Sequence, residues 1–141
     1  MANDLKIDSG MATEMIQCLA DLFDASTSNN TLKVYDDTDA IPTDADDGVG
    51  TNVLLVTINL PEPAFGTASA GAVSKTGVWS GTCVATGTAN FYRLEDDTAN
   101  TVVQGTVGLT AGTFDLEFAD ITWSTDGTVT IDTYTLTMPE S

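Results

Sequence analysis

Short runs of alternating hydrophobic and polar residues dominate the chain from about residue 31 onward. Alternation with a period of two is typical of strands that bury one face and expose the other. Turn-forming residues separate the runs, and no helical segment is expected between them. The pattern predicts a mainly β fold, an antiparallel β-sandwich or jelly-roll-like arrangement of about seven or eight strands. The predicted strands cover residues 31–36, 52–60, 73–85 (one or two strands), 88–95, 101–107, 113–119 and 128–138.

The alternation is clearest in residues 113–119, where apolar and acidic side chains take turns. We therefore expect Phe114, Leu116 and Phe118 to be buried on one face of a strand. Beyond this run the regular pattern is interrupted three times. The expected interruptions are a bend near Ala119-Asp120, a tight hairpin at Asp126-Gly127 and an irregularity near Asp132 within the last strand.

Residues 9–25 show a helical pattern instead. Apolar residues recur there at spacings of three and four, and Asp8 or Ser9 can cap the first turn. A helix of this length is marginal alone, so we expect its apolar stripe to pack against a sheet rather than to form a groove for a partner. The stripe consists of Met11, Met15, Leu19, Leu22 and Phe23, with Ile16 and Cys18 beside it.

The length of 141 residues favours one domain over 1–141, with an N-terminal arm and helix in 1–27 and the β-sandwich in 28–141. Four basic residues stand against 21 acidic ones, which gives a formal net charge of −17. Contacts to nucleic-acid phosphates and to anionic membranes depend on Lys and Arg, so this balance argues against both partners. Solubility and mutual repulsion between copies are the ordinary consequences of such acidity.

The first residues, Met1-Ala2-Asn3-Asp4, lack the basic start and apolar core of a secretory signal. No apolar run in the sequence is long enough to span a membrane, so we expect a protein made in a cytoplasm. Cys18 and Cys83 are the only cysteines. Both lie among apolar residues of expected elements, which favours two buried free thiols, while a disulfide between them stays open.

The sequence gives little support to catalysis. It contains no histidine, which removes Ser-His-Asp and Cys-His mechanisms and the commonest zinc ligand. It also contains no phosphate-binding loop and no dinucleotide fingerprint. Asp115 and Glu117 could form a carboxylate pair for glycoside hydrolysis, but the solvent side of an amphipathic strand explains them fully. We predict a non-enzymatic protein without catalytic residues, cofactor or metal.

Two features keep binding alternatives open. The acidic loop Asp36–Asp47 resembles part of a calcium-binding loop, but Gly48 and Leu55 stand where ligands belong. A solvated acidic loop is therefore favoured over a calcium site. Aromatic residues in the strands could form a platform for sugars, although core packing is their commoner use. These aromatics are Trp79, Phe91, Tyr92, Trp123 and Tyr134.

Several segments form an ordered series along nearly the whole chain. They are residues 32–36 (LKVYD), 41–46 (IPTDAD), 54–55 (LL), 60–66 (LPEPAFG), 85–94 (ATGTANFYRL), 103–108 (VQGTVG), 127–131 (GTVTI) and 134–137 (YTLT). The series resembles a widespread family of small virion proteins of tailed bacteriophages, in which an N-terminal helix also precedes the first strand. The usual Asp-Gly after that strand is Asp36-Asp37 here.

The resemblance implies a structural role in a virus particle. Members of the family look like capsid decoration (cement) proteins, which would place this chain on the capsid exterior after assembly in the host cytoplasm. The implied partner is the major capsid protein, and a homo-oligomer, such as a trimer at a threefold position, suits the symmetry of a shell. A tail or head–tail connection protein and a module that binds host glycans are the alternatives. The family brings no catalytic residues.

Overall fold

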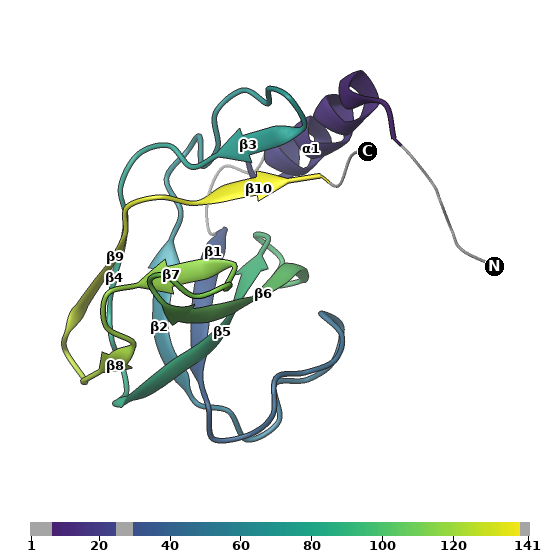
Figure 1. Ribbon diagram of the computed structural model, residues 1–141. Coiled ribbons are helices and arrows are strands. Elements are labelled where there is room, and N and C mark those ends of the chain that lie inside the picture. The colour runs from purple at the N-terminus through teal and green to yellow at the C-terminus, as the bar shows by residue number, and fades with distance from the viewer. Residues whose placement is uncertain (1–6, 25–29, 139–141) are drawn as a thin grey trace. The chain divides into compact units, whose positions relative to one another are not determined.

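The computed structural model describes residues 7–24 and 30–138. The fold is mainly β with one N-terminal helix, and its curled sheets are largely antiparallel, which confirms the predicted fold class (Figure 1). The chain divides into two compact units. The helix unit comprises residues 1–27, 61–77 and 132–141, and the sheet unit comprises 28–60 and 78–131. The proposal of one domain over 1–141, divided at residue 27, stays a prediction.

The sheet unit contains eight of the strands. Five of them form a path in the order β2-β1-β5-β6-β7, β8 pairs with β5, and β4 pairs with β9 in a separate two-stranded sheet. The helix unit contains the helix and a second two-stranded sheet, β10-β3. The bounds are α1 Ser9–Asp24, β1 Thr31–Asp36, β2 Leu54–Asn59, β3 Ala72–Ser74, β4 Trp79–Thr82, β5 Gly87–Glu95, β6 Thr101–Leu109, β7 Leu116–Phe118, β8 Thr122–Trp123, β9 Thr128–Ile131 and β10 Thr135–Thr137.

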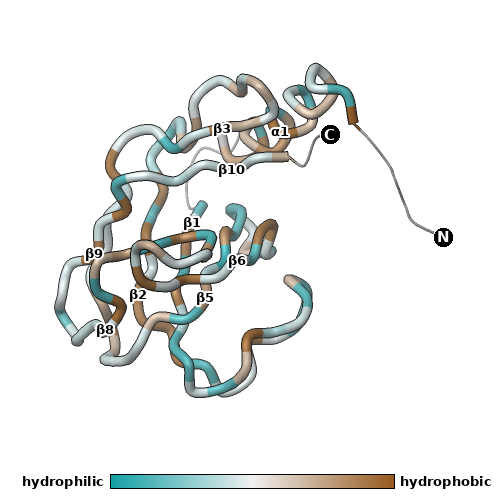
Figure 2. Tube along the Cα trace, viewed as in Figure 1, coloured by the Kyte–Doolittle hydropathy of each residue, from teal (hydrophilic) through white to brown (hydrophobic). Residues whose placement is uncertain are grey.

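The core of the sheet unit lies on one face of β1, β2 and β5. Leu32 and Val34 of β1 are fully buried, as the alternation predicts, and the register places them opposite Leu94 and Tyr92 of β5. The absence of a side chain at Gly105 leaves room for the Tyr92 ring, because an added Cβ there would overlap it. Figure 2 shows hydrophobic residues recurring along these central strands.

The predicted strands correspond closely to the observed ones in the first part of the sheet unit. β1 has the predicted bounds, and β2, β5 and β6 differ from the prediction by a few residues at their ends. The segment 73–85 contains two strands, β3 and β4, as the alternative with two strands requires. The register between β1 and β2 shifts at Val34/Tyr35, and this irregularity brings Leu55 as well as Val56 into the core.

The prediction for residues 113–119 is wrong in the length of the strand, in its direction and in part of its burial. Only Leu116–Phe118 forms a strand, β7, and it runs parallel to β6 rather than antiparallel. Leu116 is buried as predicted, but Phe118 is only half-buried and Phe114 is 44% exposed. Its ring lies over Gly108 and Gly112, where an added Cβ would overlap it. Phe114 therefore packs on a backbone surface that the two glycines create, and the strand alternation does not govern it.

The end of the chain is interrupted as predicted near Asp132, which separates β9 from β10. The turn at Asp126-Gly127 is present, with a positive φ of 69° at Asp126 and a bond from Gly127 N to the Ser124 carbonyl. It does not join a hairpin, because its neighbours β8 and β9 pair with β5 and β4 respectively. Each strand finds a better partner elsewhere in the sheet unit, which overturns the predicted hairpin.

Helix α1 begins where the sequence predicts. The Asp8 carboxylate accepts hydrogen bonds from the backbone N–H groups of Gly10 and Met11, at 3.0 and 3.3 Å, and so caps the first turn. Residue 25 of the predicted helix lies outside the described residues. None of the described helices is long and apolar enough to cross a membrane.

The prediction of which side of α1 is buried is wrong. The observed buried side is rotated about the helix axis relative to the predicted stripe. Phe23 is buried and Leu19 half-buried, but Met11, Met15 and Leu22 are exposed. The alanines of the buried side are small, so they allow the helix to pack closely against the rest of its unit. The buried side chains are Ala12, Ile16, Ala20 and Phe23.

The two cysteines differ in their surroundings. Cys18 is exposed, so the prediction of a buried thiol there is wrong, and the rotation of the helix explains it. Cys83 is buried as predicted, and burial raises the pKa of its thiol. Both are free thiols.

Candidate functional site: the acidic loop and the polar sheet face

The second face of the central sheet carries charged and polar residues from β1, β5 and β6. Strand alternation turns Lys33 and Tyr35 away from the apolar core, and the register sets them opposite Arg93 and Phe91. Arg93 in turn lies opposite Gln104 of β6. Although these residues leave the core, Arg93 and Tyr35 are buried. This polar face therefore has a cover, which the loop between β1 and β2 supplies.

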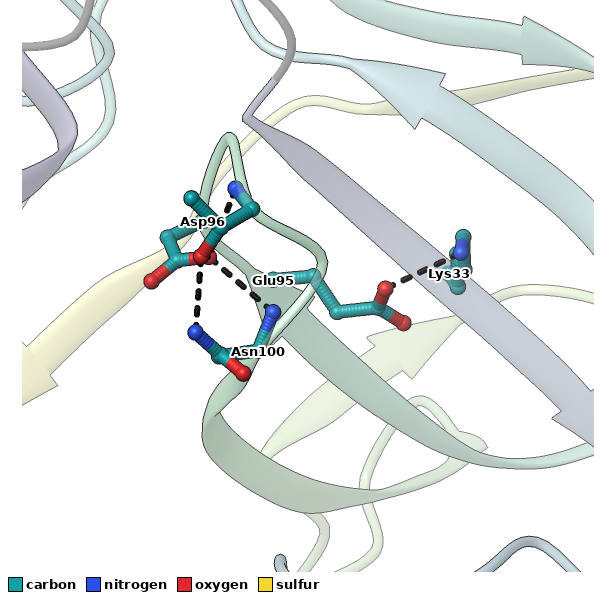
Figure 3. A network of polar contacts seen from close by, with 5 residues as sticks. Lys33, Glu95, Asp96 and Asn100 are labelled. Carbon is teal, nitrogen blue, oxygen red and sulfur yellow. Dashed lines mark hydrogen bonds and ion pairs between the residues drawn. The ribbon is translucent and has the colours of Figure 1, made fainter.

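Lys33 and Glu95 form an ion pair across this face. Lys33 Nζ lies 3.0 Å from Glu95 Oε1, with 26% and 8% of the two side chains exposed (Figure 3). The two residues are diagonal neighbours on adjacent strands, a spacing that long side chains can bridge. Burial and the Glu95 charge together raise the pKa of the Tyr35 phenol, so Tyr35 stays neutral at physiological pH.

Arg93 of β5 anchors the acidic loop through hydrogen bonds to its backbone. Its Nη2 donates to the carbonyl oxygen of Asp47 at 2.6 Å and to that of Asp44 at 3.4 Å. Its Nε donates to Gln104 Oε1 at 2.9 Å, and Gln104 Nε2 donates to the carbonyl of Pro42 at 2.7 Å. The positive charge is thus satisfied by neutral oxygens of the loop backbone, and the loop is tied to two strands.

A second set of bonds fixes the two ends of the loop. Asp36 Oδ1 accepts the backbone N–H of Val53 at 2.7 Å, and its Oδ2 accepts the hydroxyl of Thr38 at 2.6 Å. Asn52 Oδ1 accepts the N–H of Asp39 at 2.8 Å, while its amide donates to two loop carbonyls. Buried carboxylate and amide groups therefore join the two ends of the loop, beside one backbone bond from the Asp36 N–H to the Val53 carbonyl at 3.0 Å.

The acidic side chains between these anchors are exposed, although Asp39 and Asp47 also accept hydrogen bonds from within the loop. The exposed aspartates of the loop are Asp37, Asp39, Asp44, Asp46 and Asp47. The carbonyl oxygens of Asp44 and Asp47 already accept from Arg93, and Asp36 and Asp39 bond to the loop's own donors. Among the described residues no group of three or more His, Cys, Asp or Glu side chains is placed to hold a metal ion.

A compact acidic turn lies next to the ion pair, between β5 and β6. Asp96 Oδ1 accepts from the N–H and hydroxyl of Thr98 and from the N–H of Asn100, at 2.8 to 3.0 Å (Figure 3). The hydroxyl of Thr98 is the leading cause that lowers the pKa of Asp96 below its usual value. Asp96 thus serves to shape the turn as a permanent carboxylate.

The other candidate residues have structural contacts. Asp115 Oδ2 accepts from the N–H and the hydroxyl of Thr106, both at 2.9 Å, and Glu117 Oε1 accepts from the N–H of Phe114 at 3.4 Å. The strand aromatics proposed for a sugar platform are all buried, as the core interpretation predicts. They are Trp79, Phe91, Tyr92, Trp123 and Tyr134, and none is more than 9% exposed.

Sequence reasoning singled out the acidic loop but missed its anchors. Arg93 and Glu95 stand at alternate positions of a strand, in the same phase as Lys33 in the first strand. Charged residues in phase on two predicted strands are the signal that could have indicated a polar sheet face. Which loop covers that face depends on the register between strands, and the sequence does not specify that register.

Comparisons with models of known protein families, with curated proteins and with solved structures found no match to this chain.

Proposed function

We propose that this chain is a non-enzymatic structural protein of a bacteriophage particle that decorates the outside of the capsid, binds the major capsid protein and stabilises the shell. The observation that carries the proposal is the ordered series of segments that resembles small virion proteins, from residues 32–36 to residues 134–137. A mainly β fold with an N-terminal helix is compatible with it.

The charge distribution supports a role away from DNA. Three basic residues lie in the described part of the chain, and each donates to an acceptor of the chain itself: Lys33 to Glu95, Lys75 to the carbonyl of Gly77, and Arg93 to the acidic loop. The exposed loop aspartates add negative charge. A protein with this surface repels packaged nucleic acid and suits the exterior of a shell.

A decoration protein acts by linkage. A protein that binds the assembled shell and not its separated subunits stabilises the assembled state, increasingly as its concentration exceeds the dissociation constant. Weak contacts suffice where many copies or a symmetric oligomer bind a repeating lattice, because the second contact of an oligomer is effectively intramolecular. The proposal requires no catalytic residue, metal or cofactor.

The test uses undecorated shells of the phage whose genome encodes the chain. We expect the purified protein to co-sediment with these shells across a broad range of salt and to raise the temperature at which they break open. Asp44, Asp46 and Asp47 changed together to Asn form the matched variant, which removes loop charge without touching the carbonyls that Arg93 holds. We expect it to bind as wild type, since the loop would face outward.

Copy number in native particles completes the test. A decoration protein is present in hundreds of copies by the implication of the resemblance, and a connector in a handful. Failure to co-sediment at any salt concentration, together with few copies per particle, would reject decoration and favour a tail or head–tail connection role.

A further inference from the structure

Helix α1 carries a narrow apolar face that the described chain leaves uncovered. Met11, Met15 and Leu22 are 53%, 42% and 46% exposed, and Cys18 between them is exposed as well. We call these four residues the exposed seam. Their spacing of four, three and four places them within an arc of about 60° on a helix with 100° per residue. The same spacing repeats at the paired a and d positions of coiled coils.

The helix cannot roll to bury this seam within its own unit. The buried side of α1 includes Ile16 and Phe23, and the Phe23 ring packs edge-on against Phe65 at 5.7 Å. Polar bonds fix the rotation further: Thr13 Oγ1 accepts the N–H of Gly71 at 2.8 Å, and Gln17 Oε1 accepts that of Ala68 at 2.7 Å. Rolling the seam inward would break both bonds and expose the buried residues.

The charges beside the seam indicate what kind of surface can cover it. Glu14 and Asp21 are exposed and flank the seam on one side, and the helix sequence contains no Lys or Arg. Two copies that paired antiparallel along the seam would bring these carboxylates together, which is unfavourable at such positions. The net charge of −17 on each copy adds to the repulsion. A partner with basic flanking residues avoids both costs.

We propose that the exposed seam docks an amphipathic helix of a partner protein, with an apolar seam of its own flanked by Lys or Arg. The inference rests on the proposed function in one respect, that the capsid protein of the shell supplies this helix. Four seam residues make a short contact of modest strength. Many such contacts over a lattice still give firm attachment, because the copies bind together.

Cys18 provides the readout without any engineered label. It is the exposed thiol of the chain, and Cys83 is buried, so a thiol reagent such as Ellman's reagent should react fast at one site. Cys18→Ser identifies that fast phase by removing it. The probes are two synthetic helical peptides with the same leucine seam, one flanked by lysines and one by glutamates. Protection of the thiol reports coverage of the seam directly.

We expect the lysine-flanked peptide to slow the Cys18 reaction about tenfold when nine-tenths of the protein is bound, and the glutamate-flanked peptide to leave it unchanged. Leu22→Asp should abolish the protection, and Val84→Asp, at a more exposed apolar position on the sheet unit, should keep it. Circular dichroism of each variant confirms that the helix is intact. Equal protection by both peptides, or by neither, would overturn the proposal.

Three further outcomes bear on this inference, and the last two separate it from the proposed function. If Cys18 loses reactivity as the protein alone is concentrated, and Met15→Asp restores it, the occupant is a second copy and the proposal is wrong. If the protein binds shells while Cys18 stays reactive, decoration stands and the seam is not its contact. If the lysine-flanked peptide protects Cys18 but the protein does not bind shells, the seam stands and decoration fails.

Discussion

Arg93 joins three segments that are far apart in the sequence. Its guanidinium holds the carbonyls of Asp44 and Asp47 and the side chain of Gln104, although it is only 5% exposed. A buried charge is costly unless hydrogen bonds replace its hydration. Here neutral oxygens supply those bonds, so the carboxylates of the five exposed loop aspartates are not needed for them. The site depends on the forked arrangement of the guanidinium N–H donors more than on the positive charge.

Arg93→Lys tests that statement. An ammonium keeps the charge but cannot reach the loop carbonyls and Gln104 at once, so we expect a loss of about 1–3 kcal/mol in the free energy of unfolding. Urea unfolding measures it, and an aspartate-specific endoproteinase should cut the loop 37–50 faster. Lys33→Arg, at the position directly opposite, is the control and should change little. Wild-type stability in Arg93→Lys would show that the charge alone suffices.

Asp36 makes stability depend on acid pH. Burial acts to raise its pKa, but hydrogen bonds from the Thr38 hydroxyl and from the Val53 and Thr38 N–H groups outweigh it, so the pKa lies below the usual 3.8. A carboxyl whose pKa is lowered by folding contributes stability that is fully present above the usual pKa. That contribution is lost as the pH falls through the lowered value.

We therefore expect Asp36→Asn to lower the free energy of unfolding at neutral pH and to lose less of it than wild type as the pH falls below about 4. Urea unfolding at a series of pH values measures both effects. Asp37→Asn removes the same charge from the exposed neighbour and should keep the steeper dependence of wild type. Parallel curves for wild type and Asp36→Asn would refute the assigned role.

At the scale of elements, strand alternation predicted the central strands well because each buries one face in a shared core. The helix was harder to predict. Hydrophobicity favours Met and Leu over Ala for the inside, but close packing selects Ala12 and Ala20, which are fully buried. The parallel pairing of the short strand β7 with β6 could not be predicted from the sequence pattern either, since parallel pairs ordinarily need a longer crossover connection. In both cases the outcome depends on how the elements pack together, and the local pattern of hydrophobic and polar residues carries no information on that packing.

The rotation of α1 predicts a large loss of stability at one residue and almost none at its neighbour. Phe23→Ala should cost about 3–5 kcal/mol because it removes a buried ring that packs on Phe65. Leu22→Ala should change the free energy of unfolding by no more than about 0.5 kcal/mol, as expected for an exposed position. Urea unfolding followed by the helical circular dichroism signal measures both. A loss for Leu22→Ala similar to that for Phe23→Ala would restore the predicted stripe, which contains both residues.

At the scale of the whole molecule, the two units carry separate spectroscopic reporters. Both tryptophans, Trp79 and Trp123, belong to the sheet unit, while α1, the helix of the described residues, belongs to the helix unit. If residues 1–141 act as one domain, as their length predicts, tryptophan fluorescence and helical circular dichroism should report the same urea midpoint. Phe23→Ala should then shift both midpoints together. Two separate transitions would show that the units unfold independently.

The net charge of −17 should make stability rise with salt at neutral pH. Repulsion among exposed carboxylates opposes the compact state, and screening shortens its range from about 10 Å at 0.1 M to about 3 Å at 1 M salt. Salt also screens the Lys33–Glu95 pair, but a single pair with a partly exposed lysine contributes little beside that excess. We expect the melting temperature at pH 7 to increase from low to high NaCl. Near the pI of about 4.1 the increase should vanish, because the net charge does.

Calcium chloride at matched ionic strength gives this measurement a control that also bears on the acidic loop. If the loop aspartates are solvated and their carbonyls stay with Arg93, calcium should act only through ionic strength and give the same melting temperature as NaCl. A distinctly larger increase with calcium, abolished when Asp44, Asp46 and Asp47 are changed to Asn, would establish a cation site there. A melting temperature that falls with NaCl at pH 7 would mean that ion pairs outweigh repulsion. The three described basic residues and their few partners make that outcome unexpected on the charges alone.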